Sequence, residues 1–252
     1  MRINSNAGIL NTLQNAYNAK RELSLSMEKL SSGQKINKAS DNPSGLVISE
    51  KLRAQIAGVE REINNIDNTY NKLSVADSSL GSMQNNLQEM RSMAVAAANE
   101  GGNSSEAQQA YQNSMDNAVQ SYNMILESAS YGTQKLLDGS EGSAANMTAA
   151  DNYDVSSAEK AQETINLIDE KLNELNDARG DIGATQANEL DARRNSLETE
   201  LVNLTASESS VRDVDMAKEY ANLVNQQIKL DASMAMLAHE NQTAKRMVDL
   251  LN

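Results

Sequence analysis

Residues 52–73 read LRAQIAGVEREINNIDNTYNKL, and their apolar side chains recur at alternating intervals of four and three residues. This spacing places one apolar stripe on a helix and is typical of coiled-coil seams. The phase slips after Leu73 and resumes from Leu80 to Ala94, which indicates a local change in supercoil and not a helix break. A continuous helix over residues 44–99 would be about 80 Å long at 1.5 Å per residue. Such a helix needs partner helices along its length.

The expected partners are five further segments with the same apolar spacing. They are residues 3–30, 115–126, 161–175, 190–211 and 216–251. Gly180 and Gly183 are expected to interrupt the helical pattern between the third and fourth of these segments. Two serines after the break at Gly101 and Gly102 favour the start of a new helix.

Two stretches are too rich in glycine, proline and small polar residues to be helical throughout. Residues 30–49 hold Gly33, Pro43 and Gly45, which are expected to let the chain turn. Residues 131–157 are expected to form a short hairpin or loop, from which the helices return. The sequence therefore predicts an all-α fold: an elongated rod of long antiparallel helices with coiled-coil-like seams, a short mid-chain hairpin or loop, and paired terminal helices.

Composition narrows the range of functions. The chain has no Cys, Phe or Trp and only 3% aromatic residues, which suits thin seams between helices better than a thick core. The net charge of −13 argues against nucleic acid and against acidic membranes, since both need clustered Lys and Arg. No stretch approaches about eighteen consecutive apolar residues, so no membrane insertion is expected. The amino terminus lacks the hydrophobic run of a secretory signal peptide, which taken alone predicts a cytoplasmic protein.

The pattern of titratable residues supports no catalytic, cofactor or metal site. His239 is followed by Glu240, but the zinc-protease motif needs a second histidine four residues away, and the chain has one histidine. The carboxylates within residues 169–177 are interpreted as a solvated helix face, because no second helix offers matching ligands. No enzyme is predicted.

Two long motifs lie near the ends of the chain. Residues 30–45 read LSSGQKINKASDNPSG, and residues 208–219 read ESSVRDVDMAKE. Both resemble the signatures of the bacterial flagellin family. The opening MRIN and the stretch ASMAMLA at residues 232–238 extend the resemblance. It covers nearly all of the chain except residues 139–157, a segment too short for a folded outer domain. The chain thus resembles a short flagellin without outer domains.

The resemblance implies a structural subunit that self-polymerises into the bacterial flagellar filament for swimming motility. It assigns residues 1–43 and 211–252 to the inner tube, residues 44–138 and 158–210 to the rod, and residues 139–157 to a short variable tip. It also implies that the terminal helices fold when neighbouring subunits cover them, through head-to-tail contacts that propagate as a helical polymer. The inner-tube contacts are expected at Ile3, Leu10, Leu13, Leu23, Leu30, Ile228, Met234, Leu237, Leu250 and Leu251.

The resemblance also implies a route and further partners. Subunits of this family leave the cell through the flagellar type III export apparatus without a cleaved signal peptide, which replaces the cytoplasmic expectation by an extracellular one. A flagellar cap, junction proteins and an export chaperone are implied as partners. Two alternatives stay open: a hook–filament junction protein of the same family, and a cytoplasmic coiled-coil scaffold, which would leave both motifs unexplained.

Residues 87–99 resemble the stretch of flagellins that animal Toll-like receptors recognise. The segment begins at Leu87 and retains Arg91, but Glu89 stands where arginine is usual and Met93 where leucine is usual. These differences weigh against receptor binding. A further difference from the family is one extra residue within residues 186–190.

The charge of −13 predicts that salt promotes assembly, because added ions screen the repulsion between subunits. Light scattering of the purified protein is expected to rise faster as salt is raised from low to physiological concentration. Assembly that weakens steadily over this range would contradict the prediction.

Overall fold

The computed structural model describes residues 5–99, 104–150 and 153–249, which are mostly helical. The helices are α1 (Ser5–Ser32), α2 (Pro43–Ala97), α3 (Ser105–Ser128), α4 (Ala158–Ala184), α5 (Asp191–Arg212) and α6 (Met216–Asp249), with a π-helical turn, η1 (Thr185–Leu190), between α4 and α5. The strands β1 (Ser130–Tyr131) and β2 (Gln134–Lys135) form a short antiparallel hairpin. The all-α prediction and the long helix expected over residues 44–99 are confirmed.

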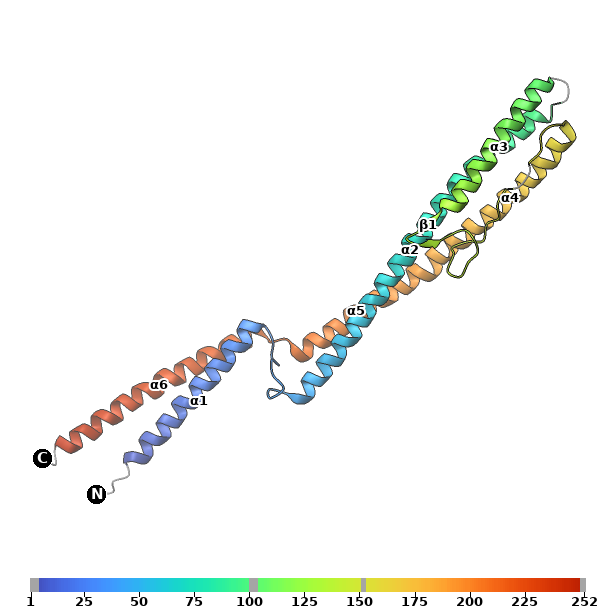
Figure 1. Ribbon diagram of the computed structural model, residues 1–252. Coiled ribbons are helices and arrows are strands. Elements are labelled where there is room, and N and C mark those ends of the chain that lie inside the picture. The colour runs from blue at the N-terminus through green and yellow to red at the C-terminus, as the bar shows by residue number, and fades with distance from the viewer. Residues whose placement is uncertain (1–4, 100–103, 151–152, 250–252) are drawn as a thin grey trace. The chain divides into compact units, whose positions relative to one another are not determined.

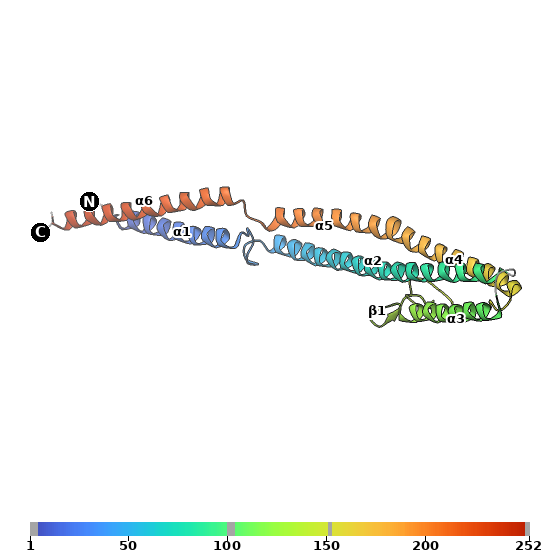
Figure 2. The ribbon, with the colours of Figure 1, turned by 90° about the horizontal axis from the view of Figure 1, so that it is seen from above.

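The chain folds into two compact units. The terminal unit comprises residues 1–58 and 201–252, and the central unit comprises residues 59–200. Within the terminal unit, α1 and α6 lie side by side (Figures 1 and 2), as the pairing of the terminal segments predicted. Within the central unit, α4 runs antiparallel to α2, and α3 lies along another side of α2 (Figure 2).

The ends of α1 and α2 follow from local chemistry. α1 ends before Gly33, which has a φ of 71° and whose N–H donates to the carbonyl of Lys29 at 2.9 Å. The side chain of Asn42 caps α2 by accepting the N–H of Gly45 at 2.9 Å. Pro43 occupies the first helical position, where the missing N–H costs nothing.

A heptad seam holds the central unit together. The buried residues of α2 recur at intervals of three and four: Leu73, Ala76, Leu80, Met83, Leu87, Met90, Ala94 and Ala97. The predicted phase slip lies between Tyr70, which is exposed, and Ala76, which is fully buried, and α2 continues through it. Ion pairs flank the seam: Arg91 Nε lies 2.6 Å from Asp169 Oδ1, and an arginine of α4 contacts Asp77 of α2 in the same way.

The π-turn η1 accommodates the extra residue noted in the sequence. Seam positions on α4 recur every seven residues at Ile168, Leu175 and Ile182, and continue at Leu190 and Leu197. The interval between Ile182 and Leu190 is eight residues, one more than a heptad. A π-turn holds one additional residue inside a helix. The seam therefore keeps its face on both sides of η1.

The expectation that Gly180 and Gly183 interrupt the helix is wrong. Both lie inside α4, and a Cβ added at either would meet nothing within 4 Å. Glycine lowers helix stability by about 1 kcal/mol relative to alanine, which weakens a helix without ending it. Buried seam residues on both sides of the pair, Leu175 and Ile182, keep the segment helical.

Residues 136–150 and 153–157, named here the strap, lie between the β-hairpin and α4 along the chain and cover the central seam. The mid-chain hairpin lies just before residues 139–157, and the described part of that segment consists of bends, turns and extended chain. The strap contributes buried side chains to the core: Leu136, Leu137, Met147, Ala150, Tyr153 and Val155.

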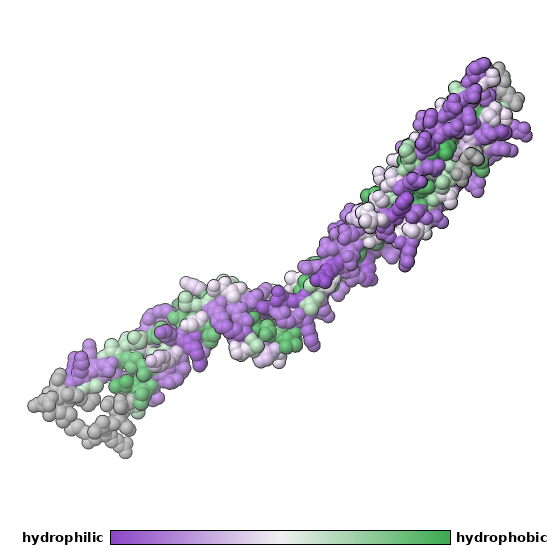
Figure 3. Space-filling model, in the orientation of Figure 1, coloured by the Kyte–Doolittle hydropathy of each residue, from purple (hydrophilic) through white to green (hydrophobic). Residues whose placement is uncertain are grey.

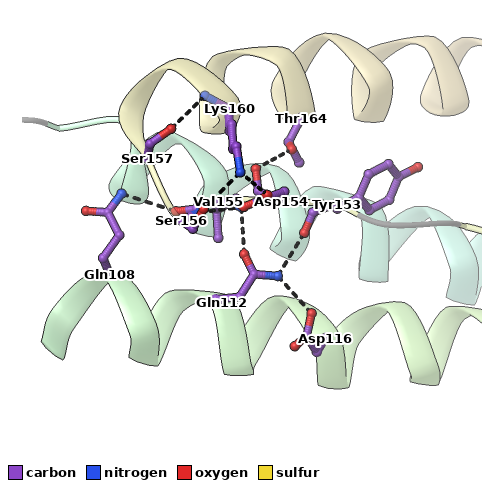
Figure 4. A network of polar contacts seen from close by, with 10 residues as sticks. All are labelled: Gln108, Gln112, Asp116, Tyr153, Asp154, Val155, Ser156, Ser157, Lys160 and Thr164. Carbon is purple, nitrogen blue, oxygen red and sulfur yellow. Dashed lines mark hydrogen bonds and ion pairs between the residues drawn. The ribbon is translucent and has the colours of Figure 1, made fainter. Parts of the chain in front are cut away.

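Amide side chains of α3 hold the backbone of the strap (Figure 4). Gln112 Oε1 accepts the N–H of Val155 at 2.7 Å, and its Nε2 donates to the carbonyl of Tyr153 at 3.1 Å. Gln108 Nε2 donates to the carbonyl of Val155 at 3.1 Å. An extended segment with few backbone partners is thus satisfied by a helix face.

On the α4 side, Asp154 anchors the end of the strap. Lys160 Nζ lies 2.6 Å from Asp154 Oδ2, and the hydrogen bonds from Lys160 and Ser156 lower the pKa of this carboxyl group from 3.8 to about 2. Because the pKa is lowered by folding, the contribution of Asp154 is present at neutral pH and is lost as the pH falls from about 4 to about 2.

Deletion of Asn188 is expected to leave the central unit folded, because it removes the additional residue of η1 and restores a seven-residue interval. The free energy of unfolding, measured by urea denaturation and circular dichroism, should stay within about 1 kcal/mol of wild type.

The matched control is deletion of Asn173, which is also exposed but lies within the regular part of α4. This deletion rotates the following seam positions by about 100°. It should cost several kcal/mol, since buried side chains such as Leu175 leave the core at roughly 2–5 kcal/mol each. Equal losses from the two deletions would contradict the role assigned to η1.

Candidate self-assembly surface

α1 and α6 are joined by a heptad seam of their own. Buried and half-buried side chains recur at intervals of three and four along both helices, and we call this set the terminal seam. It consists of Ile9, Thr12, Ala16, Ala19, Leu23, Ser26 and Leu30 on α1, and of Glu219, Leu223, Gln226, Leu230, Ser233, Leu237, Glu240 and Ala244 on α6.

The terminal seam is thin. Six of its fifteen members are polar, and Ser26 Oγ donates to Glu219 Oε1 at 2.5 Å across it. Ala16 and Ala19 are buried but contribute little apolar area. A fully buried leucine contributes roughly 1.5–3 kcal/mol, and the leucines here are only half-buried. The pair is therefore weakly held by its own contacts.

Outside the terminal seam, both helices expose large apolar side chains, which we call the exposed faces. They are Leu10, Leu13, Tyr17, Leu25 and Met27 on α1, and Met216, Tyr220, Val224, Ile228, Met234 and Met236 on α6. Leu10 is 61% exposed and Ile228 is 60% exposed. Hydrophobic surface is visible over the α1–α6 pair (Figure 3). Single exposed apolar residues are ordinary, but rows of them on neighbouring helices mark a contact surface.

The ten residues predicted as inner-tube contacts fall into three groups. Four lie on the exposed faces, namely Leu10, Leu13, Ile228 and Met234. Three lie in the terminal seam, namely Leu23, Leu30 and Leu237. The remaining three, Ile3, Leu250 and Leu251, lie outside the described residues. Apolar spacing alone could not separate the first two groups, because both follow helical periods.

The loop after α1 is tied to the segment between α5 and α6. The N–H of Lys35 donates to the carbonyl of Arg212 at 2.6 Å, and the N–H of Val214 donates to the carbonyl of Gly33 at 3.0 Å. The two motifs quoted from opposite ends of the sequence therefore meet in the terminal unit. Sequence reasoning missed this contact, because neither motif contains a pattern that predicts contact with the other.

Arg212 also links α5 to the beginning of α2 within the terminal unit. Its side chain is only 13% exposed, and Nη1 donates to Glu50 Oε1 at 2.9 Å and to Ser49 Oγ at 3.3 Å. The hydrogen bond from Arg212 lowers the pKa of Glu50. Ser49 is fully buried and donates to Glu208 Oε1 at 3.0 Å.

The three residues predicted to let the chain turn occupy different positions. Gly33 has the left-handed φ that ends α1, and Pro43 is the first residue of α2. Gly45 lies inside α2, where a Cβ would come within 2.7 Å of Ile36 Cδ1 and 2.8 Å of Asn42 Nδ2. Gly45 thus leaves room for the preceding loop and does not itself bend the chain.

In the segment that resembles a receptor-binding stretch, three of the four residues singled out contact other parts of the central unit. Leu87 is fully buried in the seam, and Arg91 pairs with Asp169 of α4. Met93 is half-buried against the core, and Glu89 is exposed. Of the four residues singled out, Glu89 is thus the most available to a partner of the single chain.

Over the described ranges, no helix is long and apolar enough to cross a membrane. In the same part of the chain, no group of three or more His, Asp or Glu side chains is arranged to hold a metal ion. The candidate functional surface is the exposed faces of α1 and α6, because both helices carry rows of exposed apolar side chains.

Two family models match the chain. The bacterial flagellin N-terminal helical region matches residues 3–142, and the bacterial flagellin C-terminal helical region matches residues 165–251. The unmatched residues 143–164 include most of the strap.

Relatives align over the whole chain. It is 34% identical to a flagellin of Halalkalibacterium halodurans and 31% identical to a flagellin of Bacillus subtilis, with all of both chains covered in each case. It is 30% identical to the flagellar filament 33 kDa core protein of Treponema phagedenis, again over all of both chains.

Replacement of Arg212 by alanine is expected to loosen the junction between the loop and α5, because a nearly buried guanidinium with two hydrogen bonds is lost. Amide hydrogen exchange at Lys35 and Val214 should become roughly tenfold faster. The matched control is Arg53→Ala, since Arg53 contacts the same Glu50 but is 55% exposed. Equal exchange in both variants would show that the Arg212 contacts do not hold the junction.

Proposed function

The chain belongs to the bacterial flagellin family and is a structural subunit of the flagellar filament, and from this premise we propose that the exposed faces of α1 and α6 carry the contacts between copies. The observation that supports the proposal is the row of exposed apolar side chains on both helices. Covering one exposed leucine or isoleucine contributes up to about 1.5–3 kcal/mol, so several per copy suffice to drive polymerisation.

Folding of the terminal helices is proposed to be completed by assembly. The terminal seam offers half-buried leucines, alanines and polar residues, which is little to hold two long helices in water. Neighbouring copies would cover the exposed faces and supply the missing apolar contact. The loss of conformational entropy on ordering the helices is then offset by the free energy of the contact between copies.

The proposed domain assignment follows the family. Residues 1–43 and 211–252 would form the inner tube, residues 44–138 and 158–210 the surrounding rod, and residues 139–157 a short tip. The strong seam of the central unit supports a self-sufficient rod domain, and the thin terminal seam supports an inner domain completed by other copies. The strap covers the core in place of outer domains.

Further partners and the export route are proposed from family membership alone. Subunits would leave through the flagellar type III apparatus without a cleaved signal peptide and would meet an export chaperone, junction proteins and a cap. The absence of cysteine suits passage as an unfolded chain, since no disulfide has to form or break.

Replacement of Leu10 or Ile228 by serine is expected to impair assembly without destabilising the single chain. Both side chains are about 60% exposed, so the free energy of unfolding should change by no more than about 0.5 kcal/mol. The critical concentration, measured by sedimentation with electron microscopy of the pellet, should rise roughly tenfold for each variant.

The control is Asn225→Ser, which changes an exposed polar residue of α6 and should assemble as wild type does. Normal assembly of both apolar variants would reject the exposed faces as the contact surface. A wild-type chain that stays in small oligomers even with filament seeds would favour the role of a junction protein.

A further inference from the structure

The chain has twelve methionines, and those whose side chains the structure describes are unevenly buried. In the central unit, Met83, Met90 and Met115 are fully buried and Met147 is 3% exposed, whereas Met93 is half-buried and Met124 is 56% exposed. In the terminal unit, the methionines whose side chains the structure describes are between 52% and 58% exposed. They are Met27, Met216, Met234 and Met236.

These four methionines belong to the exposed faces of α1 and α6. Met27 follows Leu13 by two heptads on α1, and Met216 begins the row that continues with Tyr220 at the next turn. Because Ser26 donates to Glu219, Met27 and Met216 stand at the same end of the helix pair.

Met234 and Met236 stand toward the other end of the pair. A Cβ on Gly8 of α1 would lie 3.3 Å from Glu240 Oε1 of α6, so these two residues lie opposite each other in the helix pair. Met234 and Met236 therefore lie at the same height along the pair as the part of α1 that carries its exposed leucines. They are two residues apart and so about 200° apart around α6, which places one on each side of the terminal seam. Thioethers thus occur at both ends of the helix pair.

A methionine thioether is oxidised by peroxide in a balanced two-electron step. The sulfur lone pair attacks one peroxide oxygen, the O–O bond breaks, an S=O bond forms, and water leaves. The flexible apolar side chain becomes polar and requires hydrogen-bond partners when buried. A sulfoxide is tolerated on an exposed helix face but opposes its burial against another copy.

We propose that Met27, Met216, Met234 and Met236 are oxidation sites through which peroxide reversibly blocks assembly of this chain. The inference rests on the proposed function, since it assigns a regulation to the same surface. The chain has no cysteine to react first, and the methionines of the central core are shielded. The oxidised subunit therefore keeps its folded central unit, while its assembly surface becomes polar at the oxidised methionines.

The test begins with purified full-length subunit treated with dilute hydrogen peroxide. Mass spectrometry should find sulfoxide at the four sites, while Met83, Met90, Met115 and Met147 stay reduced. The critical concentration should rise about tenfold or more, because each buried sulfoxide lacks partners. Reduction by methionine sulfoxide reductases of both stereochemical classes should restore assembly.

A variant separates these sites from the rest of the chain. Leucine at all four positions keeps an apolar helix-forming side chain that peroxide does not oxidise. Peroxide should leave the critical concentration of the M27L/M216L/M234L/M236L chain at the value that this variant has before treatment, although the variant retains Met1, Met93, Met124 and Met247. The control M124L, at a 56% exposed position on α3, should stay sensitive.

Preformed filaments give an independent measurement. Peroxide should oxidise the four methionines more slowly in filaments than in free subunits, because neighbouring copies cover them. Oxidation at equal rates in both forms would overturn the inference.

Two other results would also overturn it. One is an unchanged critical concentration of wild-type subunits that carry all four sulfoxides. The other is equal loss of assembly by the leucine variant and the wild type after peroxide. Failure of the untreated wild type to polymerise would overturn the proposed function and this inference together, whereas peroxide-resistant assembly overturns the inference alone.

Discussion

The structure depends on one constraint, the burial of apolar stripes that recur every three and four residues between antiparallel helices. The chain has no Phe or Trp, so its cores are built from Leu, Ile, Ala and Met arranged in seams. In the central unit the constraint is fully met, since α2 buries an unbroken row from Leu73 to Ala97. Two local devices preserve this seam. The turn η1 accommodates an extra residue, and the strap covers the helices with its backbone satisfied by glutamine and asparagine side chains of α3.

The terminal unit meets the same constraint only in part. The terminal seam follows a regular heptad spacing, but its members are small, polar or half-buried, and a second set of large apolar residues stays exposed. This difference between the two units suits a subunit that assembles with other copies. Under the proposed function, the central unit folds by its own contacts, and the pairing of α1 with α6 is completed by other copies. The exposed methionines fit the same surface, since they are apolar in contact and become polar on oxidation.

The terminal unit also holds a polar junction. Arg212 joins the loop after α1, the start of α2 and the end of α5 through its carbonyl and its guanidinium. Because hydrogen bonds are directional, they position these chain segments more specifically than a stripe of apolar side chains does. Residues of the two family motifs therefore meet in a structural contact within one chain.

The sequence by itself determined the helical class, the long helix over α2, the loops and the family, because heptad spacing, glycine and proline act locally along the chain. It predicted ten assembly residues, but it could not separate Leu10 and Ile228, which are exposed, from Leu23 and Leu237, which face the seam. It also expected Gly180 and Gly183 to break a helix that continues. Only the tertiary structure decided these points and the meeting of Lys35 with Arg212, because which stripe is covered depends on partners distant in sequence.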